Sequence, residues 1–195
     1  LVLEDKVHLH RLYLAWLSPG LLHPGDAEMD VTANILAGGK NSRLYKRLVY
    51  DLQIAQDVAA YQASGRLVSS FQIVATAREG HSLEELRSVI FEEIAKLKAE
   101  APAPRELQRA VNGYEASFLD RLEGIGNKAD QLNSYVTVTG NPDYFNEDLA
   151  RYKALAPDDI QMAVQTYLKT DAMVILSVVP QGKTDLAVPG KDGGK

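Results

Sequence analysis

A pair of glycines, Gly38-Gly39, limits what the first third of this chain can form. Apolar residues recur with helical spacing from Pro24 up to this pair, so we expect a helix that ends there, because glycine adopts the left-handed backbone conformation without steric cost. Ser42 stands where a second helix would be capped, and that helix is expected over residues 43–52. An alanine-rich strand is expected next, over residues 55–64.

The order of the other predicted elements indicates the fold class. Strands are predicted over residues 7–17, 69–77 and 172–179. Helices are predicted after the capping box that begins at Ser82, after Pro104, and over residues 127–138, 144–152 and 157–168. Neighbouring strands in the middle and a long helical run afterwards favour an α+β fold with a mostly antiparallel sheet. A doubly wound nucleotide-binding fold would alternate strand and helix regularly, and this chain does not.

Composition narrows the classes of partner. The chain has 195 residues, of which 46% are hydrophobic, enough for one compact domain with a sizeable core. Its net charge is −5 and no basic cluster stands out along the sequence, which excludes nucleic acid as an expected partner. No apolar run approaches the roughly 20 residues that span a bilayer. Cysteine is absent, so disulfides and thiolate metal sites are excluded.

The two ends of the chain differ from its middle. The chain begins at Leu1 without a signal-peptide pattern, so we expect a segment of a longer protein. Residues 181–195 are rich in glycine and charge and have no hydrophobic period. The expected organisation is a folded domain over residues 1–180 followed by a polar linker or disordered tail over residues 181–195.

Several motifs, taken in order, resemble one protein family. The repeat domain of the pitrilysin/insulinase zinc metallopeptidases, which is also that of mitochondrial processing peptidase and the bc1 core proteins, has a similar signature after its first long helix in the non-metal domain. The matching residues here are Gly38-Gly39-x-x-Ser42-Arg43-Leu44-Tyr45-x-x-Leu48-Val49, Ile54-Ala55, Pro104-x-Glu106-Leu107-x-Arg109-Ala110, Gly140-Asn141-Pro142 and Leu176-Ser177-Val178-Val179-Pro180. The resemblance covers residues 5–180.

The resemblance implies an antiparallel sheet covered on one face by helices, in a protein whose paired domains close over an extended peptide. The family's first domain binds zinc through His-x-x-Glu-His and a later Glu, and the Glu inside the motif is the general base for the metal-bound water. That motif is absent here. The chain is therefore similar to a non-metal-binding second domain, with no catalytic or metal residue of its own, and zinc is expected in another domain of the parent protein.

Four residues are candidates for contact with a peptide substrate: Gly38, Gly39, Lys40 and Arg47. The glycine loop would let a peptide backbone approach closely, and Arg47 is either a surface residue or a cation that lines the chamber. In active relatives the last domain supplies an Arg and a Tyr seven residues apart to the substrate carbonyl. Arg47 matches the Arg, but Ile54 stands where the Tyr would be, so the resemblance implies a second domain without that role.

Two other patterns have weaker functional interpretations. Gly38-Gly39-Lys40 lacks the spacing of a phosphate-binding loop and does not follow a strand, so nucleotide binding is not expected. His8 and His10 would share one face of the predicted first strand, where they are either metal ligands or ordinary strand residues, and no third ligand stands nearby.

These expectations define a leading functional hypothesis and its alternatives. In the leading one, the chain is a non-catalytic domain that lines the peptide-binding chamber of a zinc metalloendopeptidase and supports the zinc-bearing domain. Its partners are then the other domains of the parent chain and a peptide substrate. The alternatives are a structural or assembly protein that has lost peptidase activity, and the partner subunit of a two-chain peptidase. Compartment stays open, although a periplasmic location would fit many relatives.

Overall fold

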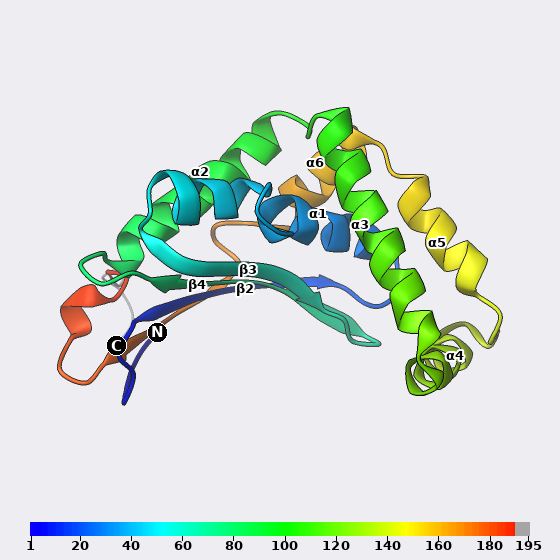
Figure 1. The fold of residues 1–195 in the computed structure, drawn as a ribbon, viewed down its shortest axis with the longest axis horizontal. Coiled ribbons are helices and arrows are strands. Elements are labelled where there is room, and N and C mark those ends of the chain that lie inside the picture. Colours follow the sequence, from blue (N-terminus) through cyan, green and yellow to red (C-terminus); the bar gives the residue numbers. More distant parts are fainter. Residues whose placement is uncertain (190–195) are drawn as a thin grey trace.

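The computed structural model describes residues 1–189, and one five-stranded sheet runs through them in the order β1-β5-β2-β4-β3 (Figure 1). β2 pairs antiparallel with β4 and β5, and β3 pairs antiparallel with β4, whereas β1 runs parallel to β5. The strands are β1 (Val2–Asp5), β2 (Arg11–Pro19), β3 (Ala55–Ala63), β4 (Val68–Ala77) and β5 (Val174–Pro180). The mostly antiparallel sheet predicted from the element order is confirmed.

Helices cover one face of this sheet (Figure 1). The helix α1 contacts β3 as well as α3 and α6, and α3 runs past the end of the strands to α4, with α5 beside it. The helical segments are α1 (Asp26–Ala37), the π-helix η1 (Tyr45–Asp51), α2 (Leu83–Ala99), α3 (Pro104–Glu123), α4 (Ile125–Thr139), α5 (Phe145–Lys153), α6 (Pro157–Tyr167) and the 3-10 helix η2 (Thr184–Leu186). The α+β class and the one-sided helical layer are therefore both confirmed. None of the helices among residues 1–189 is long and apolar enough to cross a membrane.

The core lies between the sheet and the helical layer. Alternation along β2 places Leu12, Leu14 and Trp16 on the helix side, where all three are buried, and Phe71 and Ile73 of β4 lie beside them. The indole Nε1–H of Trp16 donates to the carbonyl oxygen of Lys169 at 2.8 Å, so its one polar atom is satisfied inside the core.

The opposite face of the sheet has no helix over it in the described part of the chain (Figure 1). Apolar side chains remain accessible there: Leu17 of β2 is 73% exposed and Val174 of β5 is 51% exposed. A groove of about 650 Å³ crosses this side, and Leu3, Tyr13 and Val178 are among the residues that line it. The sheet thus has one buried and one open face.

The start of the chain differs from the prediction. The strand expected over residues 7–17 begins later, at Arg11; residues 6–10 are in no strand, and Val2–Asp5 form a separate strand, β1, that was not predicted. Val2 of β1 lies opposite Ser177 of β5, so the pairing joins the two ends of the chain. All four residues of β1 are exposed, so no alternation of buried and exposed positions marked it in the sequence.

The segment after the glycine pair also differs. Residues expected to form an α-helix over 43–52 are mostly in η1, whose wider turn is closed by the N–H of Leu52 donating to the carbonyl of Arg47 at 2.9 Å. Ser42 does not cap this helix, because its hydroxyl donates to the carbonyl oxygen of Gly39 at 2.6 Å. Ser42 closes the glycine turn instead.

The polar tail expected from residue 181 has structure in its described part. Thr184–Leu186 form η2, and both Ala187 and Val188 are buried. The backbone N–H of Val188 donates to the hydroxyl oxygen of Ser177 at 3.1 Å, which ties the segment to β5. The folded part therefore extends past the boundary expected at residue 180, and residues 190–195 of the expected tail lie outside the described residues.

Candidate functional site

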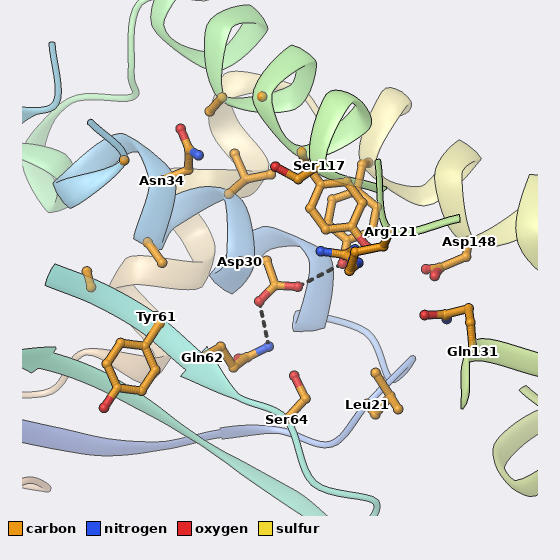
Figure 2. Close-up of a pocket in the computed structure, with 18 of the residues that line it drawn as sticks. Leu21, Asp30, Asn34, Tyr61, Gln62, Ser64, Ser117, Arg121, Gln131 and Asp148 are labelled. Atoms are coloured by element: carbon orange, nitrogen blue, oxygen red, sulfur yellow. Dashed lines mark hydrogen bonds between the residues drawn. The ribbon is translucent and has the colours of Figure 1, made fainter. Parts of the chain in front are cut away.

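A groove of about 450 Å³ lies between β3, at the edge of the sheet, and the helices α1 and α3 (Figure 2). β3 contributes Gln62, α1 contributes Asp30 and Asn34, and α3 contributes Tyr114 and Arg121. Figure 2 shows Asp30, Asn34, Gln62 and Arg121 arranged around one open space, with Asp148 of α5 beyond Arg121.

Asp30 is the acidic group at the centre of this groove. Its Oδ2 accepts a hydrogen bond from the Tyr152 hydroxyl at 2.8 Å, and its Oδ1 lies 3.4 Å from the Nε2 donor of Gln62 (Figure 2). Burial raises the pKa of the Asp30 carboxyl from 3.8 to about 7, although the Tyr152 hydroxyl favours the charged form and works against this rise. The groove therefore holds a carboxyl group that gains or loses its proton near neutral pH.

A buried network of hydrogen bonds around Asp26, one helical turn before Asp30 on α1, holds the helices in place. Asp26 is 1% exposed, and its carboxylate accepts hydrogen bonds from Arg151 at 2.8 Å, from the N–H of Leu22 at 2.9 Å and from Gln62 at 2.8 Å. These bonds join α1 to α5 and to β3. Because a buried charge is costly without such partners, the network fixes the geometry of the groove.

Aromatic side chains form the α3 and α5 side of the groove. The rings of Tyr114 and Tyr152 stack with their centroids 3.5 Å apart, and the guanidinium of Arg121 lies 5.8 Å from the Tyr114 centroid. Burial raises the pKa of Tyr114 to about 12, so its hydroxyl stays protonated and available as a donor at physiological pH.

The outer edge of β3 is free along the groove. β3 is the last strand of the sheet and pairs with β4 on one side, and within residues 1–189 no backbone group from 56 to 63 bonds to another backbone on the other side. Ala60, Tyr61 and Gln62 of this strand line the groove. A free strand edge of this kind can pair with an extended peptide.

The structure separates the four residues predicted to contact a substrate. Gly38 lines the groove beside Asn34, and Gly39 follows it with a φ of +87°, the left-handed conformation expected at the end of the helix. Lys40 is exposed and lines a different groove, next to η1 and the start of α3. Whether any of the three contacts a peptide stays a prediction.

Arg47 lines neither of these grooves. Its guanidinium Nη1 donates to Glu92 at 2.7 Å and to Glu93 at 2.9 Å, and both partners belong to α2. Ile54, which stands where active relatives have a Tyr, is buried in the core. The geometry therefore gives Arg47 a role in joining η1 to α2, and its substrate contact remains a prediction without structural support.

The histidine pair does not lie on a strand. His8 and His10 precede β2, so strand alternation does not place them on one face. His8 is exposed, whereas His10 is buried and its Nε2 bonds to the carbonyl oxygen of His81. Among residues 1–189, no group of three or more His, Cys, Asp and Glu side chains is arranged to hold a metal ion.

The polar residues of the groove were not predicted from the sequence. Asp30 and Asp26 are one helical turn apart in a segment otherwise rich in apolar residues, which is the one local signal that these acids face other parts of the protein. Tyr114 packs against the core and also lines the groove, and an aromatic residue within a helix does not by itself indicate the second of these.

Solved structures share this fold at low sequence identity. A protease from Helicobacter pylori has a TM-score of 0.84 at 22% identity, with 92% of this chain and 43% of that chain covered. The inactive peptidase domain of a candidate zinc protease from Bordetella parapertussis has a TM-score of 0.79 at 18% identity, with 92% and 97% covered. A chain of complex III from Candida albicans has a TM-score of 0.81 at 14% identity, with 96% and 49% covered.

At these identities the likeness establishes the fold, and this chain spans less than half the length of the Helicobacter pylori protease. No curated protein is similar enough in sequence to count as a match.

A protein-family model identifies the family to which the chain belongs. The model described as the Peptidase M16 inactive domain matches residues 1–114, more than half of the chain. The matched part contains the glycine pair, η1 and the free strand β3. Pitrilysin and insulinase are names for this same family, so the resemblance predicted from the motifs is confirmed. The chain belongs to the peptidase M16 family, as one of its inactive domains.

Proposed function

We propose that this chain is a non-catalytic domain that lines the peptide-binding chamber of a zinc metalloendopeptidase and supports a separate zinc-bearing domain of the same parent chain. The observation that carries the proposal is the groove between the free edge of β3 and α3. The groove combines a strand edge, which can pair with peptide backbone, with polar side chains placed to contact peptide side chains.

The shape and chemistry of the groove fit an extended peptide. The backbone of a peptide laid along β3 would exchange hydrogen bonds with the strand. Its side chains would alternate between solvent and the wall that contains Asp30, Tyr114 and Arg121. Asn34 and Gln62 add amide groups that both donate and accept hydrogen bonds. The wall can therefore form hydrogen bonds with several kinds of peptide side chain.

The open face of the sheet is the surface that we assign to contact with other domains. Leu17 and Val174 are exposed on this side, and burying such apolar surface contributes about 25 cal/mol per Å². The Helicobacter pylori protease, of which this chain covers 43%, has ample additional chain for such domains. Zinc and the hydrolytic step are assigned to one of them, because the described residues here offer no metal-binding group.

Peptide binding to the purified 195-residue chain tests the proposal. A fluorescein-labelled, uncharged peptide of about twelve residues, long enough to cover the groove at ~3.3 Å per residue, is the probe for fluorescence anisotropy. Gly113→Leu fills the groove, since a Cβ there would have Asn34 at 3.6 Å as its nearest neighbour. Gly126→Leu is the matched control, because it lies on α4 with nothing within 4 Å of its Cβ.

We expect Gly113→Leu to weaken binding by about tenfold, the loss of roughly 1.4 kcal/mol of contacts, and Gly126→Leu to leave it unchanged. Equal binding by both variants would contradict peptide binding in this groove. A purified chain that retains stoichiometric zinc after dialysis and cleaves casein would contradict the non-catalytic role.

A second candidate function is supported by the likeness to a chain of complex III from Candida albicans. In that case the fold would act as a structural or assembly surface in a protein without peptidase activity. The sequence of the rest of the parent protein separates the two functions, because a His-x-x-Glu-His motif with a later Glu in another domain is needed for the first.

A further inference from the structure

A second groove, of about 950 Å³, lies beside the first and is basic. It is formed by the loop after α1, by η1 and by the start of α3, and four of the residues that line it are cations: Lys40, Lys46, Arg105 and Arg109. All four are exposed, and none forms an ion pair with another residue among 1–189. We call this second groove the basic groove, and we call the groove between β3, α1 and α3 the peptide groove.

The acid that lines the same space does not neutralise these cations. Glu106 is held by Arg43, whose Nε and Nη2 donate to its two carboxylate oxygens at 2.8 and 2.7 Å. The whole chain has a net charge of −5, and these four residues contribute +4 to it. The rest of the protein therefore has a net charge of −9. The basic groove is thus a local positive surface on an acidic protein.

The basic groove continues into the peptide groove along one face of α3. Arg109 lines the first, and Gly113, Ser117 and Arg121 line the second, each about one helical turn after the previous residue. The glycine loop also joins them, because Gly38 lines the peptide groove and Lys40 the basic groove. From Arg105 to Arg121 the helix rises about 24 Å, the length of roughly seven extended residues.

We propose that the basic groove binds an acidic stretch of the same extended peptide that occupies the groove along β3, so that the substrate class is peptides with neighbouring Asp or Glu residues. The inference rests on the proposed function above. Carboxylates on such a stretch would pair with Lys40, Lys46 and Arg109, and the hydroxyls of Tyr45 and Tyr50 supply further donors at the same wall.

An acidic peptide fits this surface better than a nucleic acid. A nucleic acid long enough to reach several of the four cations would carry further phosphates over the acidic remainder of the chain, which repels them. A peptide places its negative charge in one short stretch and can be neutral elsewhere.

Paired peptides test the inference on the purified 195-residue chain. One labelled peptide of about twelve residues carries four glutamates in one half, and its counterpart carries four glutamines at the same places, so the two differ in charge at nearly equal size. The test variant is Lys46→Glu with Arg109→Glu, and the control variant is Lys6→Glu with Lys169→Glu, two exposed lysines outside both grooves. Circular dichroism confirms that each variant is folded.

We expect the glutamate peptide to bind about tenfold more tightly than the glutamine peptide, with the difference lost in the test variant, kept in the control variant and reduced by salt. Equal binding of the two peptides to the unaltered chain would overturn the acidic preference while leaving the proposed function in place. A preference that survives in the test variant would also overturn it, as would tighter binding of a single-stranded oligonucleotide of equal charge. If neither peptide binds, both the inference and the proposed function fail.

Discussion

Asp30 makes a specific pH dependence of stability testable. Burial raises the pKa of its carboxyl from 3.8 to about 7 in the folded protein, while the unfolded chain keeps the ordinary value. Between about pH 4 and pH 7 the folded state therefore holds a proton that the unfolded state has released, and the free energy of unfolding decreases as pH rises. The stability contributed by the neutral carboxyl is present below this window and is lost above it.

The shift of about 3 pH units corresponds to about 4 kcal/mol at 1.36 kcal/mol per unit. About two of these three pH units lie above pH 5, so about 3 kcal/mol of this stability is lost between pH 5 and pH 8. Asp30→Asn removes the titration and keeps an oxygen that can accept the hydrogen bond from Tyr152. We therefore expect the stability of this variant relative to the unaltered protein to rise by about 3 kcal/mol from pH 5 to pH 8.

Urea unfolding at several pH values between about 5 and 8, followed by the fluorescence of Trp16, measures this difference. Comparison of two proteins that differ at one residue cancels the contribution of all other titrating groups. Asp120→Asn, an exposed change on α3, is the control and should give a constant difference across the range. If the curves for Asp30→Asn and the unaltered protein stay parallel, the burial argument for Asp30 is refuted.

Four further substitutions have expected outcomes. Replacing Arg43 or Glu106 by Ala should each cost about 1–2 kcal/mol of unfolding free energy, and a double-mutant cycle should return a coupling of about 1 kcal/mol for this bidentate, half-buried pair. Arg47→Ala removes two ion pairs to α2 and should cost less than about 1 kcal/mol in thermal unfolding. The same variant should leave peptide anisotropy unchanged, and weakened binding would instead support the contact predicted from the sequence. Ser82→Ala removes the capping box of α2 and should cost about 1 kcal/mol, measured by chemical denaturation.

Local patterns were sufficient for most of the secondary structure. The capping box at Ser82 forms as predicted, with the Glu85 N–H donating to the Ser82 hydroxyl at 3.3 Å, and the glycine pair ends α1 through the positive φ of Gly39. These features depend on residues within one helical turn of each other, so the sequence contains all the information they need. The motifs also identified the family, because they occur along this chain in the same order and at a similar spacing as in the family.

Features that depend on distant residues were missed or misplaced. β1 pairs with β5 across almost the whole length of the chain, and its exposed residues have no pattern of their own. Residues 187 and 188 were assigned to a polar tail, yet contacts with β5 bury them. In both cases the partner strand, and not the local sequence, decides the structure.

The two grooves show most clearly which features the local sequence determines and which features the tertiary structure determines. The sequence by itself determined most of the helices and strands, the family and the absence of the zinc motif, because each is carried by residues that are close together in the chain. The tertiary structure alone decided that Asp30, Gln62 and Tyr114 share one groove, and that four cations scattered from residue 40 to residue 109 form another. Burial and charge density depend on which surfaces the fold brings together, and these distances in space are not encoded in any local period.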